Sequence, residues 1–354
     1  MQSYDVCECG APLRLMERPT PKPTGTEVLL KVTAAGICHS DLHFWEGVYD
    51  LGGGKHLKLT DRGMKLPLTM GHETAGQVVA LGPKAKGVKI GAKRLVYPWI
   101  GCGQCAACAR GEENICAAPH HLGIQVDGGY ATHVLVPHPR YLLDYAPLSA
   151  SFAGTLMCSG LTAYAALKRA ATNPTYASHG PMLLVGMGGV GMMGLALARN
   201  MLAHAPIVAD IDPKKRDAAL AAGAHAAFDP ADAGARKALL AATGGGVLAA
   251  IDFVGSDRSL AFATGALAKG GRVVVTGLFG GTFTMPVAMF GLKAMAIEGT
   301  QTGTLAEARE LLGFATRAWT VTPPPIHERP LAQAQAALED LRAGRVIGRV
   351  VLTA

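Results

Sequence analysis

Residues 182–191 read MLLVGMGGVG, an apolar run that leads directly into the glycine pattern GxGxxG. The run predicts a short buried strand, and the residues after it repeat their apolar positions at helical spacing. Gly186, Gly188 and Gly191 allow a tight turn and a close approach of the backbone to a pyrophosphate, whose charge the free N–H groups of a helix N-terminus stabilise. The stretch therefore predicts a strand, a turn and a helix that bind a dinucleotide.

The sequence beyond this stretch keeps the same texture, because apolar runs alternate with alanine-rich helical segments through about residue 280. Strand, helix and strand at this spacing predict a parallel sheet with right-handed crossovers. One helix is expected over 213–222, with Asp212 as its N-cap and Gly223 as its C-terminal stop.

Asp210 closes the second apolar run, nineteen residues after Gly191. A carboxylate at this point accepts hydrogen bonds from the adenosine ribose hydroxyls and would repel a 2′-phosphate. The sequence therefore favours NAD over NADP, although the basic run Lys214, Lys215 and Arg216 argues weakly for NADP.

The N-terminal region differs, with short β-branched runs separated by Gly and Pro over about residues 27–145. This pattern predicts an all-β unit. The tail after about Thr300 is too short to fold alone and is expected to return to the β-rich part. The predicted fold class is therefore α/β, with a β-rich domain from residues 1–159 and 300–354 and a doubly wound parallel-sheet domain from residues 160–299.

Composition and charge exclude several classes of protein. Only 17% of the residues are charged and 49% are hydrophobic, as in a compact globular chain. The net charge is +7, but the basic residues are scattered without interleaved aromatic residues, so no nucleic-acid partner is expected. The sequence shows neither a signal peptide nor an uninterrupted apolar run of about 18 residues, so no membrane partner is expected and a cytoplasmic location is the default.

Four of the eight cysteines lie within fifteen residues, in the pattern C-x2-C-x2-C-x7-C. Cys102, Cys105, Cys108 and Cys116 predict a Zn²⁺ site, because four thiolates at about 2.3 Å form a closed tetrahedral shell. A closed shell leaves no room for substrate. This site is therefore expected to be structural, and a catalytic metal must be sought elsewhere.

Three other potential ligands are spread along the chain: Cys38 in GICHSD, His72 in MGHETAG and Cys158 in MCSGLTAY. Two cysteines, one histidine and a water form the open shell of a catalytic zinc. Spacing alone cannot assemble ligands spread over 120 residues, and a lone cysteine in such a segment is more often a small buried apolar residue.

In order and across essentially the whole chain, GICHSD, GHE, the four-cysteine loop, CSGLTAY, VGMGGVG and the terminal GRVVL resemble the zinc-dependent medium-chain alcohol dehydrogenases. The loop WEGVYDLGGGKHLKLTDRGMKLPLTMGHE is particularly similar to the tetrameric, NAD-dependent bacterial and archaeal branch. The resemblance implies a GroES-like catalytic domain built from both chain ends, a Rossmann domain between them, two Zn²⁺ ions per chain, NAD and a homotetramer.

By motif position, the resemblance also implies a role for individual residues. Those matched to the catalytic zinc are its ligands Cys38, His72 and Cys158, the carboxylate of Glu73 beside the metal or exchanging onto it, and Asp41, which orients the zinc histidine. Those matched to the reaction and the cofactor are the proton relay Ser40 and His43, the phosphate contacts His39 and Arg349, and the ribose contact Lys215.

The implied activity is the reversible oxidation of a primary or secondary alcohol to an aldehyde or ketone by hydride transfer. Trp45 and Trp99 flank the matched segments, where they wall an apolar pocket or belong to the ordinary core. Two alternatives stay open: an NADPH-preferring aldehyde or carbonyl reductase of the same superfamily, and a non-catalytic zinc- and nucleotide-binding protein or nucleic-acid module.

Overall fold

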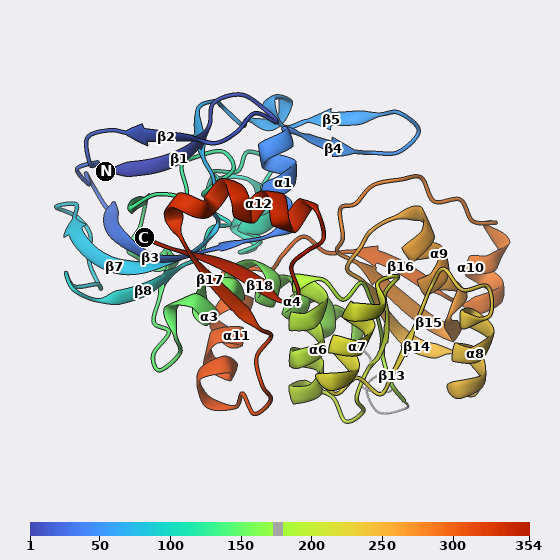
Figure 1. Cartoon of the computed structure of the whole chain (residues 1–354). Helices are drawn as coiled ribbons and strands as arrows, with labels where there is room; N and C mark the ends of the chain where they lie inside the picture. The colour runs from blue at the N-terminus through green and yellow to red at the C-terminus, as the bar shows by residue number, and fades with distance from the viewer. Residues whose placement is uncertain (173–179) are drawn as a thin grey trace.

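The computed structural model describes residues 1–172 and 180–354, which form two units side by side (Figure 1). The unit on the left is rich in strands and contains both chain ends. Its main sheet has the strand order β10-β8-β7-β3-β18-β17, with β9 paired to β3. These strands are β3 (Val28–Ile37), β7 (Glu73–Leu81), β8 (Lys93–Val96), β9 (His133–Val136), β10 (Leu142–Leu143), β17 (Ile326–Pro330) and β18 (Arg349–Thr353).

The last strand of the chain lies beside one of the first. β18 pairs antiparallel with β3, with Val350 opposite Ile37 and Leu352 opposite Ala35, and β17 pairs with β18 in parallel. Residues from the C-terminal tail thus complete the sheet of the N-terminal region. The domain boundaries at residues 159/160 and 299/300 stay a prediction.

Smaller elements surround this sheet. A second sheet has the order β2-β1-β6, and β4 and β5 form a hairpin that extends toward the other unit (Figure 1). The strands are β1 (Gln2–Val6), β2 (Arg14–Glu17), β4 (Val48–Asp50), β5 (His56–Lys58) and β6 (Leu68–Thr69). The helices are α1 (His39–Glu46), α2 (Ala106–Ala109), α11 (Leu305–Arg317) and α12 (Ala334–Arg342), with 3₁₀ turns η1 (Leu59–Arg62), η2 (Glu113–Ile115), η3 (Pro139–Tyr141) and η5 (Leu331–Gln333).

The second unit is built on a six-stranded sheet in the order β13-β12-β11-β14-β15-β16, in which all neighbours are parallel. Its strands are β11 (Leu183–Val185), β12 (Ile207–Ala209), β13 (Ala226–Phe228), β14 (Val247–Asp252), β15 (Leu267–Val275) and β16 (Ala296–Gly299). Its helices are α6 (Gly189–Met201), α7 (Pro213–Ala221), α8 (Ala235–Ala242), α9 (Asp257–Gly265) and α10 (Ala288–Lys293). The chain order reverses between β11 and β14, and ligands of such sheets bind at this switch point. The predicted fold class is confirmed.

The glycine-rich stretch forms the expected strand, turn and helix. Gly186 has a φ of +90°, which favours glycine, and a Cβ at Gly191 would collide with the carbonyl oxygen of Gly186. Helix α7 also begins as expected, because Asp212 Oδ1 accepts a hydrogen bond from Lys214 N at 2.9 Å. It ends at Ala221, one residue earlier than the sequence suggested.

One helical run precedes the parallel-sheet unit. It consists of α3 (Ala150–Thr155), the π-helical turn η4 (Leu156–Gly160) and α4 (Leu161–Ala170). Ala150–Ala170 is long and apolar enough to cross a membrane, but 94% of the apolar window is buried inside the protein, as in a core helix. Such π turns are frequent at functional sites, and η4 carries Cys158.

Candidate metal and cofactor sites

Cys38 is fixed by the first turn of α1. Its Sγ accepts a hydrogen bond from Ser40 N at 3.2 Å, and the Asp41 carboxylate accepts one from Cys38 N at 2.9 Å. The helix N-terminus favours negative charge on the sulfur. The sequence CHSD therefore caps the helix and at the same time presents a thiolate.

The structure brings Cys38 together with His72 and Cys158. The Sγ of Cys38 lies 3.2 Å from His72 Nε2 and 3.8 Å from Cys158 Sγ, and all three side chains are buried. Two thiolates about 2.3 Å from a tetrahedral Zn²⁺ are about 3.8 Å apart. The observed separation of the two sulfur atoms therefore fits a zinc ion.

Asp41 lies behind His72. Its Oδ1 is 3.2 Å from His72 Nδ1, a close electrostatic contact rather than a well-aligned hydrogen bond, and Tyr130 Oη donates to its Oδ2 at 2.9 Å. Burial would lower the pKa of His72, but Asp41 and Cys38 outweigh burial and raise the pKa well above its usual value. Tyr130 was missed by the sequence analysis, because it stands 89 residues from Asp41 and no local motif marks it.

Glu73 follows His72 but is engaged by other groups. Ser159 N donates to its Oε1 at 3.2 Å, and Arg349 forms a buried ion pair with its Oε2. Burial raises the pKa of Glu73 to about 7, against the opposing effect of Arg349. Glu73 therefore lies beside the three candidate ligands with both of its oxygens bound to the protein.

Ser40 and His43, the predicted relay, lie three residues apart on α1 and so share one helix face. The ring of His43 packs against that of Tyr49, with centroids 4.7 Å apart. Burial lowers the pKa of His43, and Glu46 opposes this effect. The imidazole is therefore neutral near pH 7 and able to accept a proton.

The glycine turn is tied to Asp210 at the end of β12. Met187 N donates to Asp210 Oδ2 at 2.6 Å, and Asp212 N donates to Oδ1 at 2.9 Å. Gly188 is the N-cap of α6, so the free N–H groups of this helix begin directly beside the Asp210 carboxylate. The structure thus brings together the predicted pyrophosphate and ribose contacts.

Arg349 and His39 connect the cofactor residues to the β-rich unit. A Cβ at Gly189 would lie 2.7 Å from Arg349 Nη1, so the guanidinium that pairs with Glu73 also lies against the first turn of α6. His39 is exposed at the surface, and partial burial lowers the pKa of its imidazole against the opposing effect of Cys38. His39 begins α1 in the β-rich unit, and Lys215 lies on α7 in the parallel-sheet unit.

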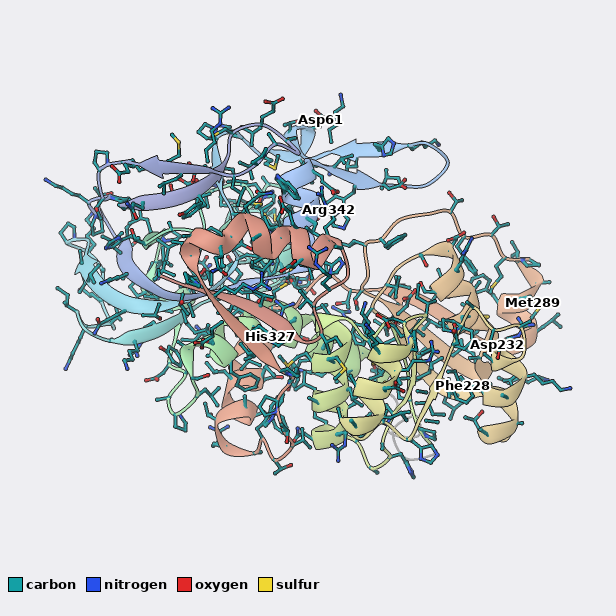
Figure 2. The ribbon with its side chains drawn as sticks, in the orientation of Figure 1. Asp61, Phe228, Asp232, Met289, His327 and Arg342 are labelled. Carbon is teal, nitrogen blue, oxygen red and sulfur yellow. The ribbon has the colours of Figure 1, made fainter. Side chains whose placement is uncertain are left out.

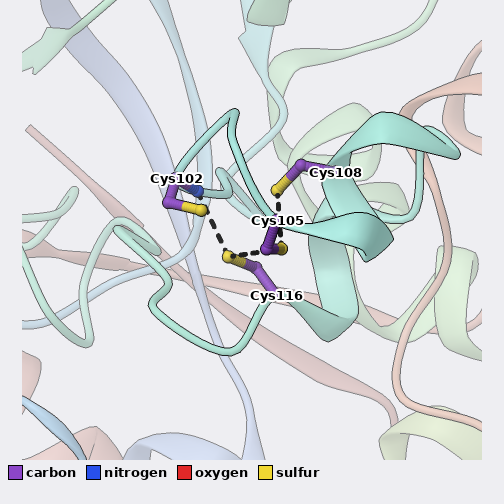
Figure 3. Close-up of side chains that lie close together, drawn as sticks. All are labelled: Cys102, Cys105, Cys108 and Cys116. Carbon is purple, nitrogen blue, oxygen red and sulfur yellow. Dashed lines mark hydrogen bonds between the residues drawn. The ribbon is translucent and has the colours of Figure 1, made fainter.

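The four cysteines of the predicted structural zinc site also meet (Figure 3). The Sγ of Cys105 lies 3.6 Å from that of Cys108 and 3.7 Å from that of Cys116, again close to the separation in a tetrahedral zinc site. All four sulfur atoms, including that of Cys102, lie within 4.8 Å of one another.

A buried carboxylate, Glu113, anchors this loop and was not expected from the sequence. Its Oε2 accepts hydrogen bonds from Gly101 N at 2.9 Å and from Tyr141 Oη at 2.7 Å, and its Oε1 pairs with Arg140. The loop is also bound to the chain near residue 301, because Asn114 Nδ2 donates to Gln301 O at 2.7 Å. None of these residues contributes a sulfur ligand, so Glu113 supports the loop from outside.

The two tryptophans differ. Trp45 donates through Nε1 to Ala11 O at 2.6 Å and lies beneath Arg342, as an ordinary core residue does. The ring of Trp99 lies 5.4 Å from that of His72 and 5.3 Å from that of His121. Of the two tryptophans, Trp99 therefore adjoins the three-ligand site, as does Phe44, whose ring centroid lies 5.8 Å from that of His72.

Comparison with known proteins agrees with this geometry. Residues 24–146 match the family model described as "Alcohol dehydrogenase GroES-like domain", and residues 189–317 match the one described as "Zinc-binding dehydrogenase". A protein of Sulfurisphaera tokodaii named NAD-dependent alcohol dehydrogenase is 34% identical over 99% of both chains.

Two further relatives bear on the fold and the cofactor. The crystal structure of an alcohol dehydrogenase from Aeropyrum pernix superposes with a TM-score of 0.88, at 27% identity and full coverage of both chains. A Saccharolobus solfataricus protein named D-arabinose 1-dehydrogenase (NADP(+)) is 29% identical over 97% of this chain and 94% of its own. Similar proteins thus carry names with either cofactor.

Proposed function

The chain belongs to the zinc-binding alcohol dehydrogenase family, and from that premise we propose that it is an NAD-dependent enzyme that reversibly oxidises primary or secondary alcohols to aldehydes or ketones. The observation that carries the proposal is the juxtaposition of Cys38, His72 and Cys158 with the glycine turn. Arg349 spans the two, because it pairs with Glu73 and lies against Gly189.

Cys38, His72 and Cys158 would hold one Zn²⁺, and the four cysteines of the loop would hold a second. In the three-ligand site, zinc supplies a Lewis acid that lowers the pKa of a hydroxyl group. Three protein ligands leave a fourth position open for substrate, whereas four thiolates close the shell. The sulfur separations of both sites support two zinc ions per chain.

The surrounding residues orient these ligands and move the proton. Asp41, held by Tyr130, fixes the ring orientation of His72. The Ser40 hydroxyl would accept the proton of the alcohol as it gives up its own, and His43 would pass a proton on to solvent. Trp99 would form a wall of the substrate site.

NAD would be held at the carboxyl ends of β11 and β12, and its nicotinamide supplies the hydride acceptor. Gly186, Gly188 and Gly191 would approach the pyrophosphate, with His39 and Arg349 as its cationic partners. Asp210 would accept hydrogen bonds from the ribose hydroxyls, and Lys215 would contact the same ribose. The carboxylate at position 210 and the name of the Sulfurisphaera relative favour NAD over the NADPH-preferring alternative.

We further propose a cytoplasmic homotetramer. Five apolar side chains near the edge strand β16 are exposed, and a patch of this kind beside an open sheet edge favours a contact between chains. They are Leu278, Phe279, Val287, Phe290 and Leu292. All eight cysteines are free, as suits a reducing compartment.

The direct test is NAD⁺ reduction with a panel of alcohols at alkaline pH, where release of a proton favours oxidation. We expect turnover with at least one aliphatic or aromatic alcohol and its loss after chelation of one zinc ion. A protein that retains full turnover with no zinc bound would contradict the proposal.

A further inference from the structure

One member of the basic run next to Asp210 is held by the backbone and by a carboxylate. The Nη1 of Arg216 donates to Asp210 O at 2.7 Å and to Ile211 O at 3.0 Å, and it pairs with Asp229 Oδ2 at 3.1 Å. Its side chain is only 21% exposed. Arg216 thus sits at the carboxyl end of β12, against the backbone of the residue whose carboxylate marks the ribose position.

Asp229 lies just beyond the end of the neighbouring strand, β13. It directly follows β13, and its other oxygen, Oδ1, accepts a hydrogen bond from Ala231 N at 2.9 Å. One carboxylate oxygen therefore caps a turn while the other compensates the guanidinium. The side chain of Asp229 is 33% exposed, so its charge is accessible at this edge of the sheet.

We propose that Asp229 is a selectivity residue that keeps the adenosine pocket specific for NAD, because it neutralises the charge that Arg216 would otherwise offer to the 2′-phosphate of NADP. The inference rests on the proposed function and deepens it. Arg216 belongs to the basic run that argues weakly for NADP. Its ion pair with Asp229 explains why this cation does not favour NADP.

The physical reason is charge compensation. A phosphate monoester carries about −1.5 to −2 charges at pH 7, so its binding requires a nearby cation that is not already paired. The pair of Arg216 and Asp229 has no net charge, and the Asp210 carboxylate repels a 2′-phosphate. Arg216 need not move for this to change, because removal of the Asp229 charge alone leaves the guanidinium uncompensated against the backbone of Asp210, the proposed ribose contact.

The test variant is Asp229→Asn. Asparagine keeps an oxygen that can accept from Ala231 N, so the turn is retained while the ion pair is lost. Arg216→Gln in the same background removes the cation but keeps a donor for the two carbonyl groups. These two variants isolate charge from local structure.

Asp232 provides the matched control (Figure 2). It lies in the same segment after β13, near the labelled Phe228, and its Oδ1 likewise caps a turn by accepting from Gly234 N at 2.8 Å. Within residues 1–172 and 180–354, no ion pair with an arginine is found for it. Asp232→Asn therefore changes the net charge by the same amount without freeing Arg216.

Calorimetric titration of the full-length chain with adenosine 2′,5′-bisphosphate and with NAD⁺ provides a readout separate from turnover. For Asp229→Asn we expect bisphosphate affinity to rise about threefold to tenfold, as for one unit charge at roughly 6–10 Å in a partly exposed site, with NAD⁺ affinity within about twofold. The gain should vanish in the double variant and be absent from Asp232→Asn.

Unchanged bisphosphate affinity in Asp229→Asn would overturn the inference, as would an equal gain in Asp232→Asn or a gain that persists without Arg216. Failure of the proposed function has a different signature. A wild-type protein that binds no NAD⁺ would contradict that function, while the bisphosphate comparison would still decide the role of Asp229.

Discussion

The two metal-binding groups of this protein are built in opposite ways. Cys102, Cys105, Cys108 and Cys116 come from one short loop, and three of them are partly exposed. Cys38, His72 and Cys158 come from three elements far apart in the chain, and all are buried. A closed shell can form from local chain alone, whereas an open shell must be assembled and held by the whole fold.

The supporting carboxylates differ in the same sense. Asp41 and Glu113 are both buried and both accept a hydrogen bond from a tyrosine, Tyr130 and Tyr141 respectively. Asp41, however, contacts the imidazole of a ligand, while Glu113 binds the backbone at Gly101. Loss of the Asp41 carboxylate is therefore expected to lower the rate of the reaction, and loss of the Glu113 carboxylate is expected to lower the stability of the fold.

The largest effect is expected for Cys38→Ser. Serine can still accept from Ser40 N and cap α1, but it is a poor zinc ligand. We expect kcat/KM to fall at least about a thousandfold, or about 4 kcal/mol, with little change in thermal midpoint. Cys7→Ser, which removes a half-buried thiol outside both groups, is the control and should leave turnover intact. Equal loss in both variants would remove the special role of Cys38.

Cys105→Ser addresses the other site and should act on stability. Loss of one thiolate from a four-thiolate shell should release one zinc ion and lower the free energy of unfolding by on the order of 3 kcal/mol. Metal analysis and thermal unfolding measure these effects. Protein that remains folded at low temperature should keep most of its kcat. If turnover fell as far as in Cys38→Ser, the distinction between a structural and a catalytic site would fail.

Tyr130→Phe tests the support of the open site. Removal of the hydroxyl takes away one of the two donors to Oδ2 of buried Asp41 and leaves only Cys38 N, so His72 is oriented less firmly. Changes in such supporting groups cost roughly tenfold to a hundredfold in activity or metal affinity, and we expect the lower end. The matched control is Tyr97→Phe, an equally buried tyrosine whose hydroxyl donates to Gly303 O at 2.9 Å. It should affect stability alone; a similar loss of zinc affinity in both variants would contradict the role of Tyr130.

The contrast between the sites also explains what the sequence could predict. The four-cysteine site, the turn after β11 and the N-cap of α7 depend on residues close in the chain, so spacing and residue type were enough. Cys38, His72 and Cys158 could be grouped only through family resemblance. Tyr130 and Asp229 escaped prediction altogether, because each acts through a partner on another element and neither carries a local pattern.

The smallest effect is expected for Glu113→Gln, which completes the comparison with Asp41. Glutamine can still accept a hydrogen bond from Gly101 N. The ion pair with Arg140 is lost, however, and the hydrogen bond that Tyr141 donates becomes weaker. We expect a loss of about 1–2 kcal/mol in unfolding free energy, measured in urea, with kcat/KM unchanged. Neighbouring Glu112 pairs with Arg110 at the surface, so Glu112→Gln should cost less than about 0.5 kcal/mol. A Glu113→Gln protein of normal stability but tenfold lower kcat/KM would show that the loop takes part in the reaction. The reason is that Glu113 supports a closed zinc site, so its loss should affect turnover only by destabilising the fold.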